Sequence, residues 1–84
     1  MSFEECWSKI LQNEGENFKT ITDLDFSYKV QNDILVPSRT DYKIQKSEVQ
    51  KAFDLMPLKG PGEINDLVRG PAYVWAILND QRIK

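Results

Sequence analysis

The 84-residue sequence predicts one small α+β domain, in which a short antiparallel β-meander of three or four strands packs against an N-terminal helix and C-terminal helices. Three observations predict this class. Apolar residues recur every three or four positions near the N-terminus, they alternate with polar residues from 26 to 31, and the seven residues 72–78 are all apolar. An amphipathic helix, a half-buried strand and an enclosed helix account for these patterns in turn.

The N-terminal segment has the pattern of a capped amphipathic helix. Ser2 and Glu5 have the spacing of a capping box, in which the two side chains accept hydrogen bonds from backbone N–H groups at the helix start. We expect the helix to end at residues 13–15, because Gly15 is able to adopt the left-handed conformation that is common after a helix. An apolar stripe runs along it at helical spacing: Phe3, Cys6, Trp7, Ile10 and Leu11.

Residues 25–37 have the pattern of a β-hairpin. Apolar and polar residues alternate from 26 to 31, which is the period of a strand with one buried face. Asn32 and Asp33 tolerate the positive φ angles of a two-residue turn, and an apolar strand follows at once. Pro37 ends this second strand because it lacks a backbone N–H.

Two further strands are expected, at residues 18–22 and at residues 42–44, with a turn at residues 23–25 that joins the first of them to the hairpin. Asp23 and Asp25 bracket this turn, where Asp is favoured because it hydrogen-bonds its own backbone. Paired carboxylates are also able to hold a divalent cation. Since no calcium-loop spacing is present, we favour the turn.

A second helix is expected after the strands. Ser47 and Gln50 have a capping-box spacing, and apolar residues follow at i, i+3, i+4 and i+7. These patterns predict a helix from about Glu48 to Met56, which Pro57 ends.

The remaining segment leads into the final helix. Residues 59–62 are rich in turn-forming residues, but they lack the glycine pattern of a phosphate-binding loop. Residues 64–68 have the apolar spacing of one or two helical turns. Pro71 occupies the first position of the final helix, which is expected at the centre of the fold because it has no polar face. The expected core takes residues from every element: Leu11, Phe26, Tyr28, Val36, Phe53, Leu67, Val74, Trp75 and Leu78.

The composition excludes several classes of site. With no His and one Cys, the chain cannot assemble the usual zinc and copper ligand sets, a His general base, or a Ser-His-Asp or Cys-His arrangement. We therefore expect no enzyme activity, no metal and no cofactor. Cys6 cannot form an internal disulfide, and neither a secretory signal nor a membrane-spanning apolar run is present, so we expect a cytoplasmic protein that does not enter a membrane.

The best candidate for a nucleic-acid contact is the basic segment from residue 39 to residue 51. Tyr42 or Tyr28 would offer a stacking surface beside its bases. The interpretation we favour is a solvated strand and helix start, because Asp41 and Glu48 interrupt the patch and the formal net charge of the chain is −2. The candidate contacts in this segment are Arg39, Tyr42, Lys43, Lys46 and Lys51.

Two arginines flank the final helix and complete the candidate binding residues. Arg69 is expected to hydrogen-bond backbone carbonyls or to pair with Asp66 or Asp80, and so to hold the entry of the helix in place. The alternative is that its guanidinium group binds an anionic partner. Arg82 lies just beyond the other end of the helix.

Three segments of the C-terminal half carry a resemblance. They are residues 44–53 (IQKSEVQKAF), residues 60–64 (GPGEI) and residues 69–83 (RGPAYVWAILNDQRI). Together they resemble a small uncharacterised bacterial domain family. Because no activity or site is attached to that family, the resemblance implies a bacterial cytosolic origin and a fixed core.

By elimination, the sequence favours a non-catalytic binding module that acts through a protein partner or through self-association. A nucleic-acid-binding accessory domain, which would use the segment from Arg39 to Lys51, is the alternative. A third hypothesis is a small enzyme that uses a carboxylate or a tyrosine as its acid or base.

Overall fold

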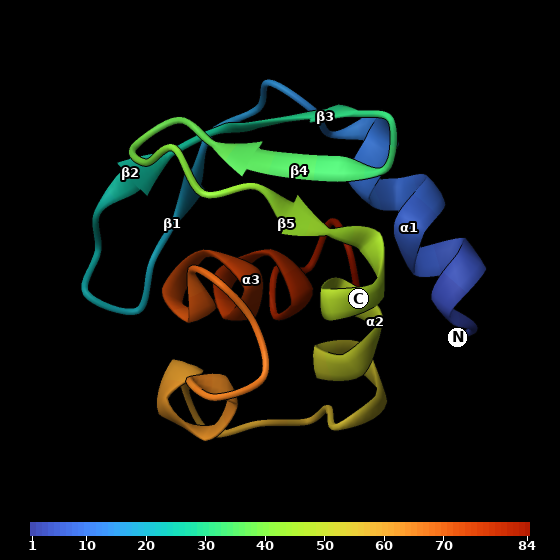
Figure 1. Cartoon of the computed structure of the whole chain (residues 1–84), viewed down its shortest axis with the longest axis vertical. Coiled ribbons are helices and arrows are strands. Elements are labelled where there is room, and N and C mark those ends of the chain that lie inside the picture. The colour runs from blue at the N-terminus through green and yellow to red at the C-terminus, as the bar shows by residue number, and fades with distance from the viewer.

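The computed structural model describes residues 1–84 and arranges the chain as one helix, five short strands and two further α-helices (Figure 1). The predicted α+β class is confirmed. The elements in chain order are α1 (Phe3–Gln12), β1 (Phe18–Lys19), β2 (Asp25–Phe26), β3 (Tyr28–Gln31), β4 (Ile34–Pro37), β5 (Ile44–Gln45), α2 (Lys46–Asp54), the 3-10 helix η1 (Pro61–Ile64) and α3 (Pro71–Leu78).

The predicted antiparallel meander is present as the three-stranded sheet, and two further strands form a second, separate antiparallel sheet. β1 pairs with β2, and β3, β4 and β5 form a three-stranded sheet in chain order. The division falls at Ser27, whose backbone N–H donates to Ser38 Oγ at 3.0 Å and whose carbonyl accepts from the Ser38 N–H at 2.8 Å. Because Ser27 bonds to the residue beyond β4, the chain changes pairing partner there, and the hairpin begins at Tyr28 and not at residue 25.

The predicted turn of the hairpin is confirmed. Asn32 and Asp33 have φ angles of 53° and 61°, so both occupy the left-handed region that a tight two-residue turn requires. The turn fixes the register, in which Gln31 is paired with Ile34 and Val30 with Leu35. Gly15, after α1, has φ 86° and confirms the predicted helix end.

The start of α2 differs from the prediction. The helix begins at Lys46, directly after β5, and Gln45 is its N-cap. Glu48 is the third residue of the helix, and its Oε2 accepts from the Gln45 backbone N–H at 2.9 Å. Ser47 is therefore inside the helix and not its cap, and the helix ends at Asp54, two residues before Met56.

The core lies between the helices and one face of the three-stranded sheet. Tyr28 is buried on that face, and its hydroxyl group donates to the Ile10 carbonyl of α1 at 2.6 Å. α3 lies beneath the sheet in Figure 1, beside α2 and above η1. Eighteen apolar residues form a single buried cluster, which includes Phe26, Val74 and Leu78 as predicted.

Five of the predicted core residues are not fully buried. Leu11 is 46% exposed, because the buried stripe of α1 is narrower than the sequence spacing suggested and ends at Ile10. Leu67 is 41% exposed, because it lies in a turn whose buried positions are Ile64 and Val68. The other three are partly buried: Val36, Phe53 and Trp75.

Trp75 reaches the edge of the core. Its indole Nε1–H donates to the Leu58 carbonyl at 3.2 Å, which supplies the partner that a partly buried indole needs. This bond ties α3 to the segment between α2 and η1. None of the helices combines the length and the apolar character that crossing a membrane requires.

Gly70 and Pro71 begin α3 as the sequence predicts. Gly70 has φ 58°, and a Cβ atom at this position would lie 3.0 Å from Tyr42 Cδ2 and 3.2 Å from Tyr73 Cδ2. Both the backbone conformation and the close approach of two rings therefore require glycine.

We predict that Gly70→Ala lowers the free energy of unfolding by about 1–3 kcal/mol, because alanine is strained at positive φ and its methyl group displaces Tyr42 or Tyr73. Urea denaturation followed by tryptophan fluorescence measures this loss. Gly62→Ala is the matched control, because no atom lies within 4 Å of the added methyl group. Equal stability of the two variants would contradict this account of the helix start.

Candidate functional site

The side of the three-stranded sheet that faces away from the core carries exposed and partly exposed side chains. Strand side chains alternate between the two faces, and Tyr28, Leu35 and Ile44 are buried on the inner one. Figure 1 shows β3, β4 and β5 in turn from top to bottom, with α2 and α3 below β5. We name this side the outer face and define it by Lys29, Gln31, Ile34, Val36, Lys43 and Gln45.

The strand register arranges the outer face in two rows. Gln31 and Gln45 lie on either side of Ile34, since both are paired with it. In the second row, Lys29 is paired with Val36. Lys43 directly precedes β5 and has no strand partner, but it lines the same hollow as Lys29 and Val36. The apolar residues of β4 on this face, Ile34 and Val36, therefore lie among polar side chains.

A shallow hollow of about 570 Å³ covers much of this face. Eleven residues line it, among them Lys29 and Lys43, and none of them is an Asp or a Glu. Neither lysine takes part in an ion pair, although the whole chain has 13 acidic residues against 11 basic ones. The hollow is thus a locally cationic surface on an acidic protein.

The edges of the sheet, in contrast to this face, are occupied. On β3, the Tyr28 carbonyl accepts from the Gly15 N–H at 3.0 Å, and the Val30 N–H donates to the Glu14 carboxylate at 2.6 Å. On β5, the Gln45 N–H is bonded to Glu48. An added strand would need these backbone groups, so the edges are poor sites for strand addition and the face is the accessible surface.

The predicted basic segment does not form one patch. Lys46 Nζ lies 3.7 Å from Glu4 Oε1 of α1 and 5.5 Å from the centroid of the Trp7 ring. Arg39 Nε donates to the Asp25 carbonyl of β2 at 2.7 Å. Because α1 and β2 lie at opposite ends of the structure in Figure 1, these two bases cannot contact the same phosphate.

The other three residues of that segment are also separated. Lys43 lies in the hollow, whereas Lys51 is exposed on α2. Tyr42 is half exposed, with its ring against Gly70 at the start of α3. Of the five candidate contact residues in that segment, Lys43 is therefore the one that lines the hollow.

Arg69 does not make the predicted contacts. Its side chain forms no ion pair with Asp66 or Asp80 and no hydrogen bond to a backbone carbonyl. The backbone N–H of Arg69 donates instead to Glu48 Oε1 at 3.0 Å, so Glu48 ties this loop to α2 through the main chain. The guanidinium group remains in solvent as a free cation.

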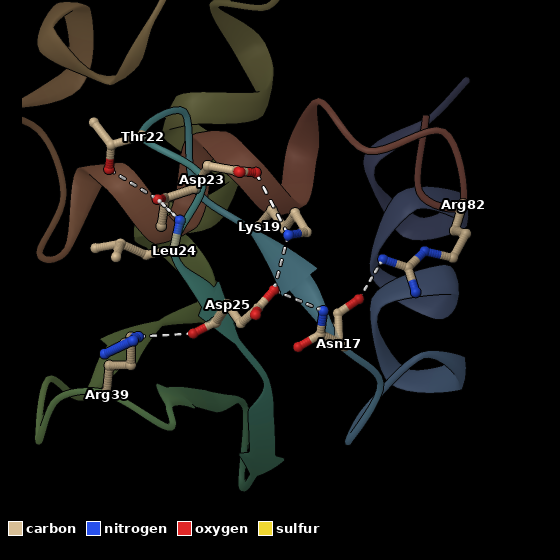
Figure 2. A network of polar contacts seen from close by, with 9 residues as sticks. Asn17, Lys19, Thr22, Asp23, Leu24, Asp25, Arg39 and Arg82 are labelled. Atoms are coloured by element: carbon tan, nitrogen blue, oxygen red, sulfur yellow. Dashed lines mark hydrogen bonds and ion pairs between the residues drawn. The ribbon is translucent and has the colours of Figure 1, made fainter.

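Arg82 is engaged within the fold. Its Nε and Nη2 atoms donate to the two oxygens of Asp80 at 2.9 and 3.0 Å, and Nη2 also donates to the Asn17 carbonyl at 2.8 Å. Figure 2 shows this guanidinium group beside Asn17. It also lies 4.0 Å from the centroid of the Phe18 ring. These contacts fasten the C-terminus to β1 and leave few donors for a ligand.

Asp23 and Asp25 support the turn between β1 and β2. Lys19 Nζ lies 3.5 Å from Asp23 and 3.3 Å from Asp25, as Figure 2 shows. A hydrogen bond from Asn17, followed by the contacts with Lys19, lowers the pKa of Asp25. Asp23 has φ 69°, a conformation that Asp tolerates in turns. The structure gathers no group of three potential metal-ligating side chains at this turn or elsewhere.

Cys6 is buried in the core. It lies at the base of an apolar groove of about 280 Å³ that Met1, Phe53 and Met56 also line. Burial raises the pKa of the thiol to about 11, so the protonated and unreactive form predominates at neutral pH.

Of the six residues that define the outer face, Lys43 alone was among the candidate binding residues predicted from the sequence. The alternation along β3 placed Lys29 and Gln31 on the polar side of a strand, but it did not identify their neighbours. The two-residue turn at Asn32 and Asp33 was the available signal, because it fixes the register and so pairs Lys29 with Val36. The partners on β5 follow a loop whose path the sequence does not define.

Comparison of the chain with protein-family models, with curated proteins and with solved structures finds no match. The resemblance of the C-terminal half to a small bacterial domain family stays a prediction.

We predict that Cys6 of the folded protein reacts with a disulfide reagent such as DTNB at pH 8 at least about 100-fold more slowly than Cys6 of the urea-unfolded chain. At a pKa of about 11, roughly one thiol in a thousand is ionised at pH 8, and burial also blocks the reagent. Release of thionitrobenzoate measures the rate. Comparable rates in the two states would contradict the burial of Cys6.

Proposed function

We propose that the protein is a non-catalytic binding module that holds a protein partner on its outer face. The observation that carries this proposal is the uncovered centre of the sheet, where Val36 is partly exposed between Lys29 and Lys43. Protein-binding surfaces have apolar side chains at their centre and polar ones at their rim. The occupied sheet edges support binding through the face and not through an added strand.

The chemistry of the side chains favours binding over catalysis. The chain has no His, and its one thiol is buried with a raised pKa. Hydrogen bonds from Arg82 lower the pKa of Asp80, and those from Ser2 lower that of Glu5. Each of these shifts favours the ionised carboxylate, whereas a general acid needs a carboxyl group that stays protonated near neutral pH.

The distribution of aromatic side chains favours a protein over a nucleic acid. Single strands are bound by a basic groove together with aromatic rings on which bases stack. The outer face has no exposed ring, because Tyr28 turns inward and its hydroxyl group is bonded to Ile10. The ring of Tyr42 lies against Gly70, at the start of α3.

Site-specific photocrosslinking in the native host tests the proposal. The variant Val36→p-benzoylphenylalanine places the photoreactive group at the centre of the outer face, and we expect a discrete crosslinked product of the chain with a second, different protein. Leu55→p-benzoylphenylalanine is the matched control, because Leu55 is exposed at the end of α2, away from the outer face. We expect no such product from the control.

Three results would contradict the proposed function. One is the absence of a product at position 36 under conditions in which the folded variant is present. Another is a product with twice the mass of the chain, which would identify a second copy as the occupant. The third is a product that nuclease treatment removes, which would identify a nucleic acid.

A further inference from the structure

We infer that the outer face binds an extended acidic segment of its partner, with the pattern acidic-x-apolar-x-acidic. The inference rests on the proposed function and names the chemistry that the same surface recognises. It is carried by the row Lys29, Val36 and Lys43, in which two free cations lie on either side of one apolar side chain.

The dimensions of this row fit an extended segment that crosses the strands. Neighbouring strands lie about 4.8 Å apart, so the backbones of β3, which carries Lys29, and β5, which Lys43 directly precedes, are separated by about 10 Å, with β4 and Val36 between them. Residues i, i+2 and i+4 of an extended peptide point to the same side and span about 13 Å. The side chains of the two lysines are long and flexible enough to span the difference between these two lengths. Each ammonium group therefore reaches one carboxylate while the central apolar residue of the peptide lies on Val36.

Charge complementarity selects an acidic ligand. Three basic residues have acidic partners within the fold, namely Lys19, Lys46 and Arg82, whereas exposed bases outside the hollow such as Lys51 and Lys59 are unpaired. Lys29 and Lys43 have no acidic partner either, and no carboxylate lines the hollow between them. An acidic segment would neutralise both ammonium groups, while the net negative charge of the rest of the protein limits attachment to other sites.

Uncharged polar side chains supply the remaining contacts. Gln31, Asn32, Ser38 and Thr40 line the same hollow. An extended segment that lies on a sheet face has its own backbone N–H and C=O groups to satisfy. Because the edge groups of the sheet are occupied, side-chain amides and hydroxyls are the donors and acceptors available to it.

Fluorescence anisotropy with a defined probe tests this inference. The probe is a fluorescein-labelled peptide of sequence Gly-Ser-Glu-Ser-Val-Ser-Glu-Ser-Gly, measured at 20 mM and 300 mM salt. We expect saturable binding that weakens at high salt, since the contacts are partly exposed ion pairs. A peptide with Gln at both Glu positions and one with Ser at the Val position should each bind at least about fivefold more weakly.

A pair of double variants assigns the binding to the outer face. Lys29→Gln together with Lys43→Gln should weaken binding of the acidic peptide at least about fivefold. Lys51→Gln together with Lys59→Gln makes the same change in net charge at exposed lysines outside the hollow and should leave binding unchanged. Because none of these four ammonium groups is paired within the fold, all four substitutions are expected to preserve it, which circular dichroism checks.

Several results would overturn the inference. They are the absence of binding to the acidic peptide, equal losses in the two double variants, and tighter binding of a ten-nucleotide oligo-dT strand than of the peptide. If the peptide fails to bind while a protein still crosslinks at Val36, the acidic-segment inference is wrong and the proposed function stands. If nothing crosslinks at Val36 and the peptide binds as expected, the preference of the outer face for an acidic segment stands and the proposed function is wrong.

Discussion

A helix with no charged residue on any side has to be enclosed by the rest of the chain, because water does not solvate any of its faces well. α3 is such a helix, and its residues Val74, Ala76, Ile77 and Leu78 are buried. The inner face of the sheet, α1 and α2 all place their apolar side chains in the same cluster with it. Gly70, in the left-handed conformation, sets where this helix starts, and the bond from Trp75 to Leu58 helps to hold it.

Because the other helices pack around the apolar α3, the outer face of the sheet is not covered by a helix. In a chain of 84 residues, α1 and α2 bury their apolar side chains with α3 on the inner side of the sheet, and no helix remains to cover the outer face. Loop residues nevertheless protect the sheet edges, through Glu14 and Gly15 on β3 and Glu48 on β5. A small sheet with protected edges and one uncovered face resists strand-to-strand association while it still offers a surface for recognition.

The features that the sequence predicted correctly depend on short-range patterns. The turn at Asn32 and Asp33, the helix start at Gly70 and Pro71 and the α+β class all follow from residues that are neighbours in the chain. The errors at the candidate site concern relations between distant segments. Arg82 contacts Asn17 across 65 positions, and Lys46 and Arg39, which are close in sequence, contact opposite ends of the fold. Charge spacing along a chain does not predict a surface patch when a strand, a helix start and a loop direct the side chains differently.

α3 and its neighbours cover one face of the three-stranded sheet and leave the other to solvent. Methyl relaxation by a soluble gadolinium chelate tests it most directly in the unmodified protein at dilute concentration. The structure predicts strong relaxation of the methyl groups of Ile34 and Val36, which lie on the outer face, and weak relaxation of those of Leu35 and Ile44, which are buried. Equal protection of all four residues would contradict the claim, because it would mean that the outer face is covered as well.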